Sequence, residues 1–517
     1  MKKFQKLLAL LLVAAMTVTM LSACGNSEKA DTSADTEAET EAASDDEEMA
    51  EINVMVLSLG AMGEGKTEVE NQINAITEKE INTHVTLNYV EVGSYSEQLN
   101  LAITGNEKVD LCMTTPIPGS NFVTLTANNQ LLPLNDLLDE YGKEMQDVVG
   151  DLVKGTTVKG NIYAVPAYRN LVSSTYIIAR KDLLESTQQL DAFNNMKTWT
   201  EYENIMKAVT ANNDIAGISN TDAQGTVISV LQSFLDAENI ADASSYDGLG
   251  DGYKLIACDE DGKVFNYFES DEYKTMIERV NNWYEEGLVY KDAATSDQTG
   301  DELMKSNVSF SFVGMAEIGV ESSKKGATGY DVAVQKLNTA PITTNSCTKF
   351  DWAVPVSATE KEAAVKFLNL MYTNKDIANL LAWGVEGRDY VVKDGVAAFP
   401  EGVTRDNVQY HTADFLYGSQ FLVYPWEGSP ATLREEAAAE MKDGGVSPYL
   451  GFSCDTTVIS NELAAISNVI SEYAPTLESG TTIEYYDDFI KSLKDAGADK
   501  VIAEYQTQLD AWLAEQK

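Results

Sequence analysis

The sequence predicts an α/β protein with more than one domain, and three observations carry this prediction. Strand patterns alternate with helix patterns from residue 51 onward, which is typical of parallel sheets built from βα units. The chain of 517 residues is several times longer than a typical domain. Its 44% hydrophobic and 23% charged residues are ordinary globular values that leave enough apolar side chains for extensive cores.

The elements are predicted from apolar periodicity, which has a period of about two residues in strands and about 3.6 in helices. The expected strands cover residues 52–57, 84–92, 109–113, 162–165, 174–179, 308–313 and 331–337. The first expected helices cover residues 67–80 and 95–104, and the chain is mostly helical from residue 360 onward, with a turn-rich stretch at 387–429. Trp199 and Trp283 lie within helical patterns and are predicted to belong to the core.

The charge balance excludes several classes of partner. The chain has 37 Lys and Arg against 81 Asp and Glu, a formal net charge of −44. Nucleic acids and anionic membrane surfaces require a basic face, so neither is expected to be the main partner. With His84 and His411 as the only histidines, multi-histidine zinc sites and HExxH metalloprotease sites are excluded by counting. No metal and no cofactor are predicted.

The N-terminal segment predicts export and a lipid anchor. Lys2, Lys3 and Lys6 precede an apolar run over residues 7–20 that ends in Leu-Ser-Ala before Cys24. This pattern predicts a signal peptide at residues 1–23. The small residues before the cysteine resemble a bacterial lipobox, so Cys24 is the predicted lipidation site; the alternative is a plain signal peptide.

Residues 24–50 are predicted to form a disordered acidic tether after the lipidated cysteine. Ten acidic residues and a single lysine, Lys29, lie between residues 25 and 50. A segment of this composition cannot bury enough apolar surface to fold.

Four further cysteines are widely spaced, and none forms a CxxC motif. They are Cys112, Cys258, Cys347 and Cys454. Disulfides are possible in an exported protein. We predict buried free thiols instead, because Cys112 lies in an apolar strand pattern.

Residues 60–67 match the phosphate-binding expression GxxxxGK[ST] between a strand and a helix. The alternative is a glycine-rich turn in which Thr67 caps the helix. Glu64, Glu68 and Glu70 would repel phosphate, and Asp110 is a poor magnesium partner, so the turn is favoured.

Two other possible sites are weaker. The acidic segment 259–262 lacks the ligand spacing of a calcium loop and is predicted to be the turn of a hairpin. A glycosidase pair of carboxylates is compatible with this acidic composition but cannot be located in it.

Several segments resemble extracellular solute-binding proteins of ABC importers, especially the maltose-binding-like carbohydrate group. The segments are KGNIYAVP at 159–166, RKDLL at 180–184, KTWTE at 197–201, NWYEEGL at 282–288 and the helix at 362–373. Residues 383–390, 451–456 and 503–512 resemble a lipoprotein subgroup that is often linked to oligosaccharide uptake. That subgroup commonly has Phe where this chain has Cys454.

The resemblance implies a two-lobe, periplasmic-binding-protein-like (type II) α/β fold with a hinge and a ligand cleft between the lobes. It assigns residues 51–166 and 308–375 to lobe 1, and residues 167–307 and 376–517 to lobe 2. The implied crossings lie just after Pro166, near residues 307–314 and near Thr373. Ligands of such sheets bind where strand ends and loops converge.

Candidate ligand contacts follow from this expected geometry. Thr114 and Thr115 end a strand and would offer hydroxyls to the cleft, or they simply begin a loop. At the first crossing, the Tyr168 ring could stack on the apolar face of a sugar, while Arg169 and Asn170 could bind its hydroxyls.

The C-terminal part supplies further candidates. Trp383, Glu386 and Arg388 combine an aromatic platform with charges; the alternative is a core tryptophan with a structural Glu386–Arg388 link. Trp426 lies in a loop, where an exposed aromatic side chain would suit a ligand platform.

The resemblance therefore implies a lipid-anchored, monomeric binding protein on the outer face of the bacterial cell membrane. It would capture an oligosaccharide by lobe closure and deliver it to ABC transporter permease subunits. The alternatives are a secreted lipoprotein glycoside hydrolase, a binding protein for a peptide or another ligand, and a surface adhesin or scaffold.

Overall fold

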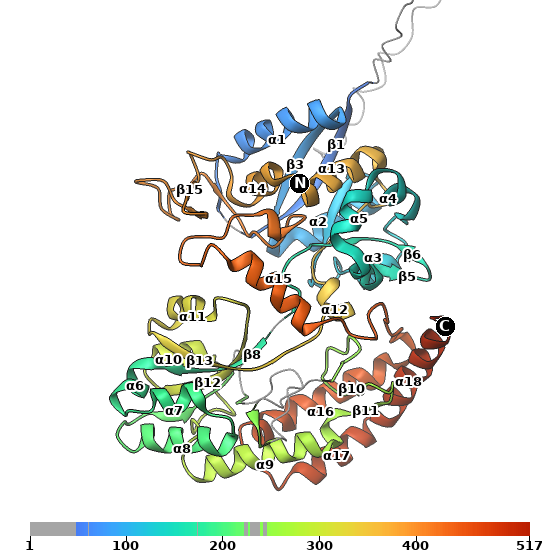
Figure 1. Cartoon of the computed structure of the whole chain (residues 1–517). Coiled ribbons are helices and arrows are strands. Elements are labelled where there is room, and N and C mark those ends of the chain that lie inside the picture. The colour runs from blue at the N-terminus through green and yellow to red at the C-terminus, as the bar shows by residue number, and fades with distance from the viewer. Residues whose placement is uncertain are drawn as a thin grey trace, which may run out of the picture. The chain divides into compact units, whose positions relative to one another are not determined.

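The computed structural model describes residues 48–59, 61–172, 174–221, 226–227, 238–240 and 246–516, and Met49–Lys517 forms one compact unit. The predicted signal peptide, Cys24, nearly all of the tether and Gly60 lie outside the described residues. No helix of the described part combines the length and apolarity needed to span a bilayer. The unit contains two main sheets (Figure 1). Each sheet has its own hydrophobic core.

The first sheet has five strands in the order β3-β1-β4-β14-β7. They are β1 (Ala50–Ser58), β3 (Thr83–Glu91), β4 (Leu111–Thr114), β7 (Val165–Pro166) and β14 (Asp351–Ala353). β1 runs parallel to β3 and β4, while β14 runs antiparallel to β4. Residues 54–58 of β1 are all buried, as expected for a central parallel strand covered on both faces.

Helices pack against this sheet and against one another. They are α1 (Lys66–Ile81), α2 (Val92–Thr104), α3 (Phe122–Ala127), α4 (Asn135–Tyr141), α5 (Lys143–Val149), α13 (Lys361–Thr373) and α14 (Lys375–Trp383). Asn74 of α1 fixes the helix to the neighbouring strand, since its side chain accepts from the Val85 amide at 2.6 Å and donates to the Val85 carbonyl at 2.9 Å.

The second sheet has four strands in the order β13-β8-β12-β9. They are β8 (Ser174–Arg180), β9 (Ala216–Ile218), β12 (Ser309–Ala316) and β13 (Val332–Thr339). Its helices are α6 (Lys181–Ser186), α7 (Leu190–Asn195), α8 (Trp199–Thr210), α10 (Gly300–Lys305) and α11 (Val320–Thr328). The KTWTE segment starts α8 with a capping box between Thr198 and Glu201, so its role is local.

The C-terminal helices complete the second core. They are α16 (Ser460–Glu478), α17 (Tyr486–Asp495) and α18 (Ala498–Glu515), which pack on α9 (Asp271–Glu285) and on the β10–β11 hairpin (Ile256–Cys258 and Val264–Asn266). This hairpin confirms the turn predicted for residues 259–262. Trp199 and Trp283 are fully buried, which confirms their assignment to the core.

The chain passes between the two sheets at different points from those expected. β12 and β13 pair with β8, so residues 309–339 belong to the second sheet and not to the first lobe as predicted. The second crossing is therefore the segment 340–350, which contains α12 (Thr344–Cys347). Strand periodicity reveals a strand but not its partner, because pairing depends on contacts distant in sequence.

The third crossing also lies later than predicted. Ile377, Tyr410 and Tyr417 are buried in the first core, whereas Phe452 belongs to the second. The return to the second half therefore includes α15 (Leu433–Gly444), which contacts β13. Figure 1 shows α12 and α15 between the two sheets.

Candidate functional site

The first and third crossings run side by side through two backbone hydrogen bonds. The Tyr168 amide donates to the Gly418 carbonyl at 2.8 Å, and the Gln420 amide donates to the Tyr168 carbonyl at 2.8 Å. The second crossing joins them, because the Ala167 amide donates to the Phe350 carbonyl at 3.0 Å. Segments far apart in sequence thus place their side chains in one region between the sheets.

Two pairs of half-buried aromatic rings lie on these crossings. Tyr168 packs against Phe421 with ring centroids 4.9 Å apart, and Phe350 packs against Phe415 at 5.6 Å. The Arg169 guanidinium lies 5.9 Å from the centroid of the Phe350 ring. Aromatic faces that remain partly open beside a cation are typical linings of small-molecule sites. We call Tyr168, Phe350, Phe415 and Phe421, together with Arg169, the crossing cluster.

Arg169 has unused hydrogen-bonding capacity. In the described part of the chain its side chain makes one hydrogen bond, from Nη1 to the Asn170 carbonyl at 3.1 Å. Burial lowers the pKa of the guanidinium, and the nearby carboxylates of Glu317 and Asp351 oppose that shift. Because a guanidinium carries five N–H donors, most of them remain available for a ligand's oxygen atoms.

Glu317 and Lys349 are open to water but closely surrounded by protein. Both side chains are exposed, yet loss of bulk solvent raises the pKa of Glu317 and lowers that of Lys349. Among the described residues, Glu317 forms no ion pair with Arg169 or with Lys349. Charges of both signs thus face this region without being paired to each other.

Asp351 directly follows Phe350 of the crossing cluster in the chain. It is fully buried, its Oδ2 accepts from the Thr114 hydroxyl at 2.7 Å, and its Oδ1 has no hydrogen-bond partner among the described residues. Burial raises the pKa of Asp351 to about 8, while the Thr114 hydrogen bond and Arg169 oppose this shift.

Asp351→Asn is expected to flatten the dependence of stability on pH. The folded protein holds the Asp351 proton up to about pH 8, whereas an unfolded aspartate loses it near pH ~4. The stabilisation is therefore complete below the unfolded pKa and is lost as the pH rises through the folded pKa. The melting temperature of Asp351→Asn relative to the unmodified protein should rise between about pH 5 and 8. Parallel melting curves of the two proteins across this range would contradict the assignment.

Asn170 and Glu440 connect the first crossing to α15. The Asn170 amide donates to Glu440 Oε2 at 3.1 Å, and the Ser174 hydroxyl donates to Glu440 Oε1 at 2.6 Å. Lys336 of β13 forms an ion pair with the same carboxylate at 2.9 Å. Asn170 is buried and fully engaged, so its geometry favours holding α15 in place. Thr115 is likewise buried, with its hydroxyl 2.7 Å from that of Ser120.

Trp383 and Trp426 belong to a second aromatic group. Trp383 is buried, stacks on His411 at a centroid distance of 4.9 Å and donates from Nε1 to the Tyr424 carbonyl at 2.9 Å. Trp426 is half-buried, with its ring centroid 4.5 Å from that of His411. Phe399 completes the group at 4.8 Å from Trp426. Burial lowers the pKa of His411 to about 4, which leaves the ring neutral at physiological pH.

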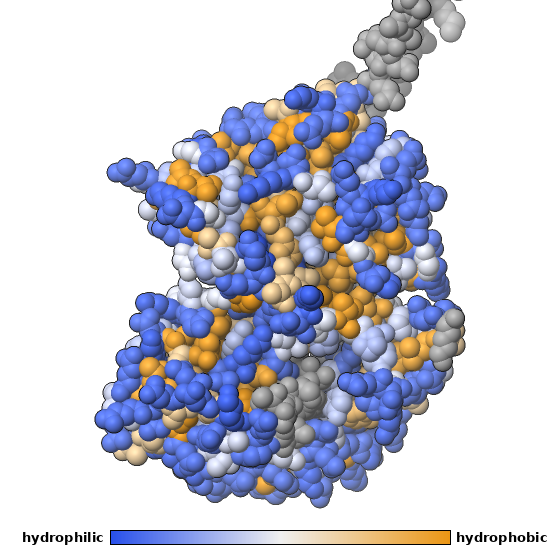
Figure 2. Space-filling view, in the orientation of Figure 1, coloured by the Kyte–Doolittle hydropathy of each residue, from blue (hydrophilic) through white to orange (hydrophobic). Residues whose placement is uncertain are grey.

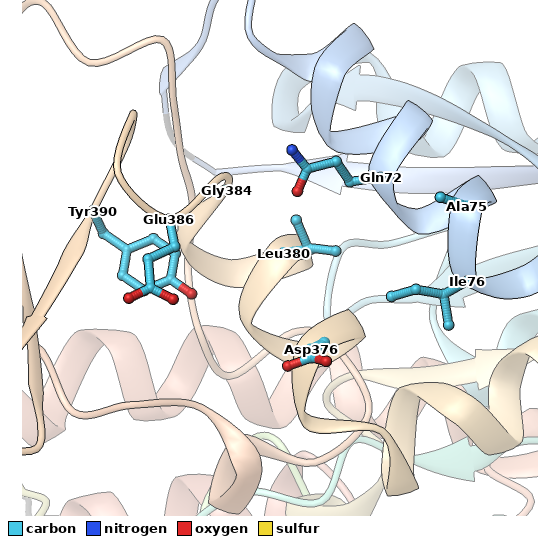
Figure 3. Close-up of a pocket in the computed structure, with 8 residues that line it drawn as sticks. All are labelled: Gln72, Ala75, Ile76, Asp376, Leu380, Gly384, Glu386 and Tyr390. Carbon is cyan, nitrogen blue, oxygen red and sulfur yellow. The ribbon is translucent and has the colours of Figure 1, made fainter.

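Glu386 lines a pocket of about 340 Å³ between α1 and α14. Figure 3 shows Glu386 and Tyr390 on one side of this pocket and Gln72 of α1 on the other. Arg388 does not pair with Glu386 but with the buried Asp389, and its Nη2 donates to the Gly65 carbonyl at 3.1 Å. The suggested Glu386–Arg388 link is therefore absent among the described residues.

The glycine-rich segment is used for packing. β2 (Ala61–Met62) pairs with β17 (Tyr410–His411), and a Cβ atom on Gly63 would lie 3.0 Å from the Gln409 carbonyl oxygen. The prediction that Thr67 caps α1 is wrong: the N-cap is Gly65, without a side-chain cap. Tight backbone approach, more than phosphate binding, explains these glycines.

The structure brings together Thr114, Tyr168, Arg169 and Asn170 but separates them from Glu386. The crossing region is completed by residues that were not predicted from the sequence, namely Phe350, Phe415, Phe421, Glu317 and Asp351. No local pattern identifies these residues, because they lie on three segments that only the fold brings together. All four cysteines predicted to be unpaired are free thiols; Cys112, Cys258 and Cys347 are buried and Cys454 is half-buried.

Comparison with known proteins agrees with this architecture. A carbohydrate ABC transporter substrate-binding protein of Streptococcus pneumoniae serotype 4 is 24% identical over 471 residues, covering 90% of this chain and 91% of the relative. Lipoprotein LipO of Bacillus subtilis is 22% identical over 395 residues, covering 74% of this chain and 73% of LipO.

The fold is similar to that of the N-glycan transport solute-binding protein NgtS of Streptococcus pneumoniae. The TM-score is 0.74 at 21% identity, covering 90% of this chain and 100% of NgtS. A domain of unknown function (DUF3502) matches residues 448–514. The sequence profile described as bacterial extracellular solute-binding protein matches residues 71–388, more than half of the chain. The chain therefore belongs to the bacterial extracellular solute-binding protein family.

Proposed function

We propose that this protein captures an oligosaccharide between its two halves and delivers it to the permease of an ABC importer. The observation that carries the proposal is the crossing cluster, in which Arg169 makes one side-chain hydrogen bond to the described residues and lies beside partly open aromatic rings. A sugar presents apolar C–H faces to such rings and oxygen atoms to such donors. Tyr168, Phe350 and Arg169 are the contacts that we assign with this geometry.

Known relatives support a carbohydrate ligand. The curated relative from Streptococcus pneumoniae is described as a carbohydrate transporter component, and NgtS has been solved with Man1GlcNAc and with Man5GlcNAc. Shared fold alone does not specify a ligand, so the chemistry of the crossing cluster is the argument for this chain.

Capture would operate by closure of the two halves. The crossing cluster lies on the segments that connect the sheets, so a ligand bound there touches groups whose relative positions depend on the hinge. A ligand favours the closed form only by binding it more tightly than the open form. Glu317 directly follows β12, and Arg169 lies on the first crossing. Because the two residues come from different segments, a ligand that contacts both would bind the closed form more tightly than the open form.

The N-terminal pattern supports an anchored location. Lipidation at Cys24 would hold the protein on the outer face of the membrane, and the acidic tether would leave the binding unit free to reach the permease as a monomer. The structure of these residues lies outside the described part of the chain, so the proposal rests on their sequence.

Thermal unfolding with a panel of sugars tests this function. The panel contains mono- and oligosaccharides, including Man1GlcNAc and Man5GlcNAc, and the integrity of each sugar is followed by mass spectrometry. A ligand at 100 times its dissociation constant stabilises the native state by about 2.7 kcal/mol, so a clear rise in melting temperature is expected. The sugar should remain intact. Consumption of the sugar would indicate a glycoside hydrolase, and no shift across the panel would refute carbohydrate capture.

A further inference from the structure

A second pocket, of about 200 Å³, lies between the two halves of the molecule. From the first half it is lined by α3 and by Gly155, Thr157 and Val158. From the second half it is lined by Leu249, Gly250 and the C-terminal region. α12 of the second crossing forms part of the wall between them. Figure 2 shows hydrophobic residues gathered on the visible face at the level of α12, and Val123 of the pocket is 53% exposed.

The C-terminal wall combines an apolar surface with an unused hydroxyl. Phe452 and Tyr505 line the pocket and are each only 3% exposed. Tyr505 makes no side-chain hydrogen bond in the described part of the chain, although its phenol group could donate and accept. Cys454, also in the wall, is half-buried beside it. These residues all lie in the region 448–514, to which the comparison assigns no function.

Hydrogen bonds hold this wall in place. The Gly451 amide donates to the Thr344 hydroxyl of α12 at 2.8 Å. The Gln508 side chain of α18 accepts from the Asp455 amide at 2.8 Å and donates to the Asp455 carbonyl at 2.9 Å. The loop that carries Phe452 and Cys454 is thus fixed to a crossing segment at one end and to α18 at the other. A wall fixed in this way is preorganised for binding.

The pocket adjoins the crossing cluster along the chain. Thr348 lines the pocket and Phe350 belongs to the cluster. Two residues of backbone span at most about 7 Å, so one extended ligand can reach both places. The two sites together therefore suit a chain of linked sugar units better than a single monosaccharide.

We propose that this pocket holds a terminal sugar unit of the captured oligosaccharide, and that the C-terminal region thereby favours longer glycans. The inference rests on the proposed function and adds a role for residues 448–514. Phe452 and Leu249 offer apolar surface to a sugar ring, while Tyr505 and the polar side chains around α12 offer hydrogen bonds.

Filling the pocket tests the proposal. Cys454→Trp adds bulk to the pocket wall, and Val458→Trp adds the same bulk at a side chain that is 62% exposed outside it. The probes are the shortest and longest members of the sugar series that raises the melting temperature, starting with Man1GlcNAc and Man5GlcNAc. We expect Cys454→Trp to weaken binding of the longer sugar at least tenfold and to leave the shorter one unchanged. Val458→Trp should alter neither affinity.

Chemical protection of Cys454 provides a measurement that does not depend on the folding of a variant. Maleimide labelling of the unmodified protein is followed by peptide mapping. Burial raises the pKa of the Cys454 thiol to about 12, so labelling is slow even without ligand, and each rate is compared with the rate measured in the absence of sugar. The longer sugar should slow labelling of Cys454 several-fold, whereas the shorter sugar, which also closes the halves, should not. Binding of a long sugar without this protection, or equal protection by both sugars, would overturn the pocket assignment. Absence of any sugar binding would instead refute the proposed function.

Discussion

Arg169→Met is expected to weaken oligosaccharide binding by roughly 10- to 100-fold, which is the effect of losing one charge-assisted hydrogen bond worth about 1.5–3 kcal/mol. Among the described residues the guanidinium makes one side-chain hydrogen bond, and it lies over the Phe350 ring. Methionine preserves much of the apolar length of the side chain but removes every donor. Isothermal titration calorimetry with the best sugar of the panel measures the change.

Two matched variants separate this effect from a general loss of charge or of folding. Arg405→Met makes the same substitution at an exposed arginine and should bind the sugar normally. Arg169→Lys retains the charge but loses the planar fork, so an intermediate affinity is expected. Circular dichroism verifies that each variant is folded. Unchanged affinity in a folded Arg169→Met protein would contradict the assignment of Arg169 to the ligand.

Trp283→Ala is expected to lower the free energy of unfolding by about 3–5 kcal/mol, the usual cost of removing a buried aromatic side chain. Trp283 is fully buried on α9, with its ring centroid 5.9 Å from Tyr202 and 6.2 Å from Trp199, both on α8. Its Nε1 donates to Glu203 Oε2 at 2.9 Å, so the substitution also leaves that carboxylate without this partner. Urea unfolding followed by far-UV circular dichroism measures the loss.

Trp283→Phe and Val458→Ala are the comparisons for this prediction. Phenylalanine keeps most of the apolar volume and should lose less stability than alanine. Val458 is 62% exposed, and its truncation should change stability by no more than about 0.5 kcal/mol. A loss below about 1 kcal/mol in Trp283→Ala would mean that the core between α8 and α9 can collapse around the gap.

Local features of the fold could be predicted because their causes are local. Apolar periodicity predicted β1, β3, β8, β12 and β13, and the helical patterns around Trp199 and Trp283 correspond to α8 and α9. The predicted hairpin at 259–262 also formed, since its turn and flanking apolar residues are adjacent in sequence.

The assignment of strands to sheets could not be predicted in the same way. β12 and β13 have the same apolar character as strands of the first sheet, yet they pair with β8. Thr67 is another example. It suited a helix cap by its residue type, but Gln409 and Arg388 approach the glycine-rich segment closely and the N-cap is Gly65, two residues earlier.

The residues of the candidate site also fall into two groups, those that could be predicted from the sequence and those that could not. Tyr168, Arg169 and Asn170 could be proposed from one short segment, whereas Phe350, Phe415 and Glu317 have no distinguishing neighbours in the sequence. The sequence by itself determined the α/β class, the family resemblance and one segment of the site, because these depend on periodicity and on residues close together in the chain. Only the tertiary structure decided where the chain crosses between sheets, how Arg169 meets Phe350, and that residues 448–514 line a pocket with α3 and α12. The physical reason is that these features depend on pairings between segments up to hundreds of residues apart, which packing of the whole chain selects.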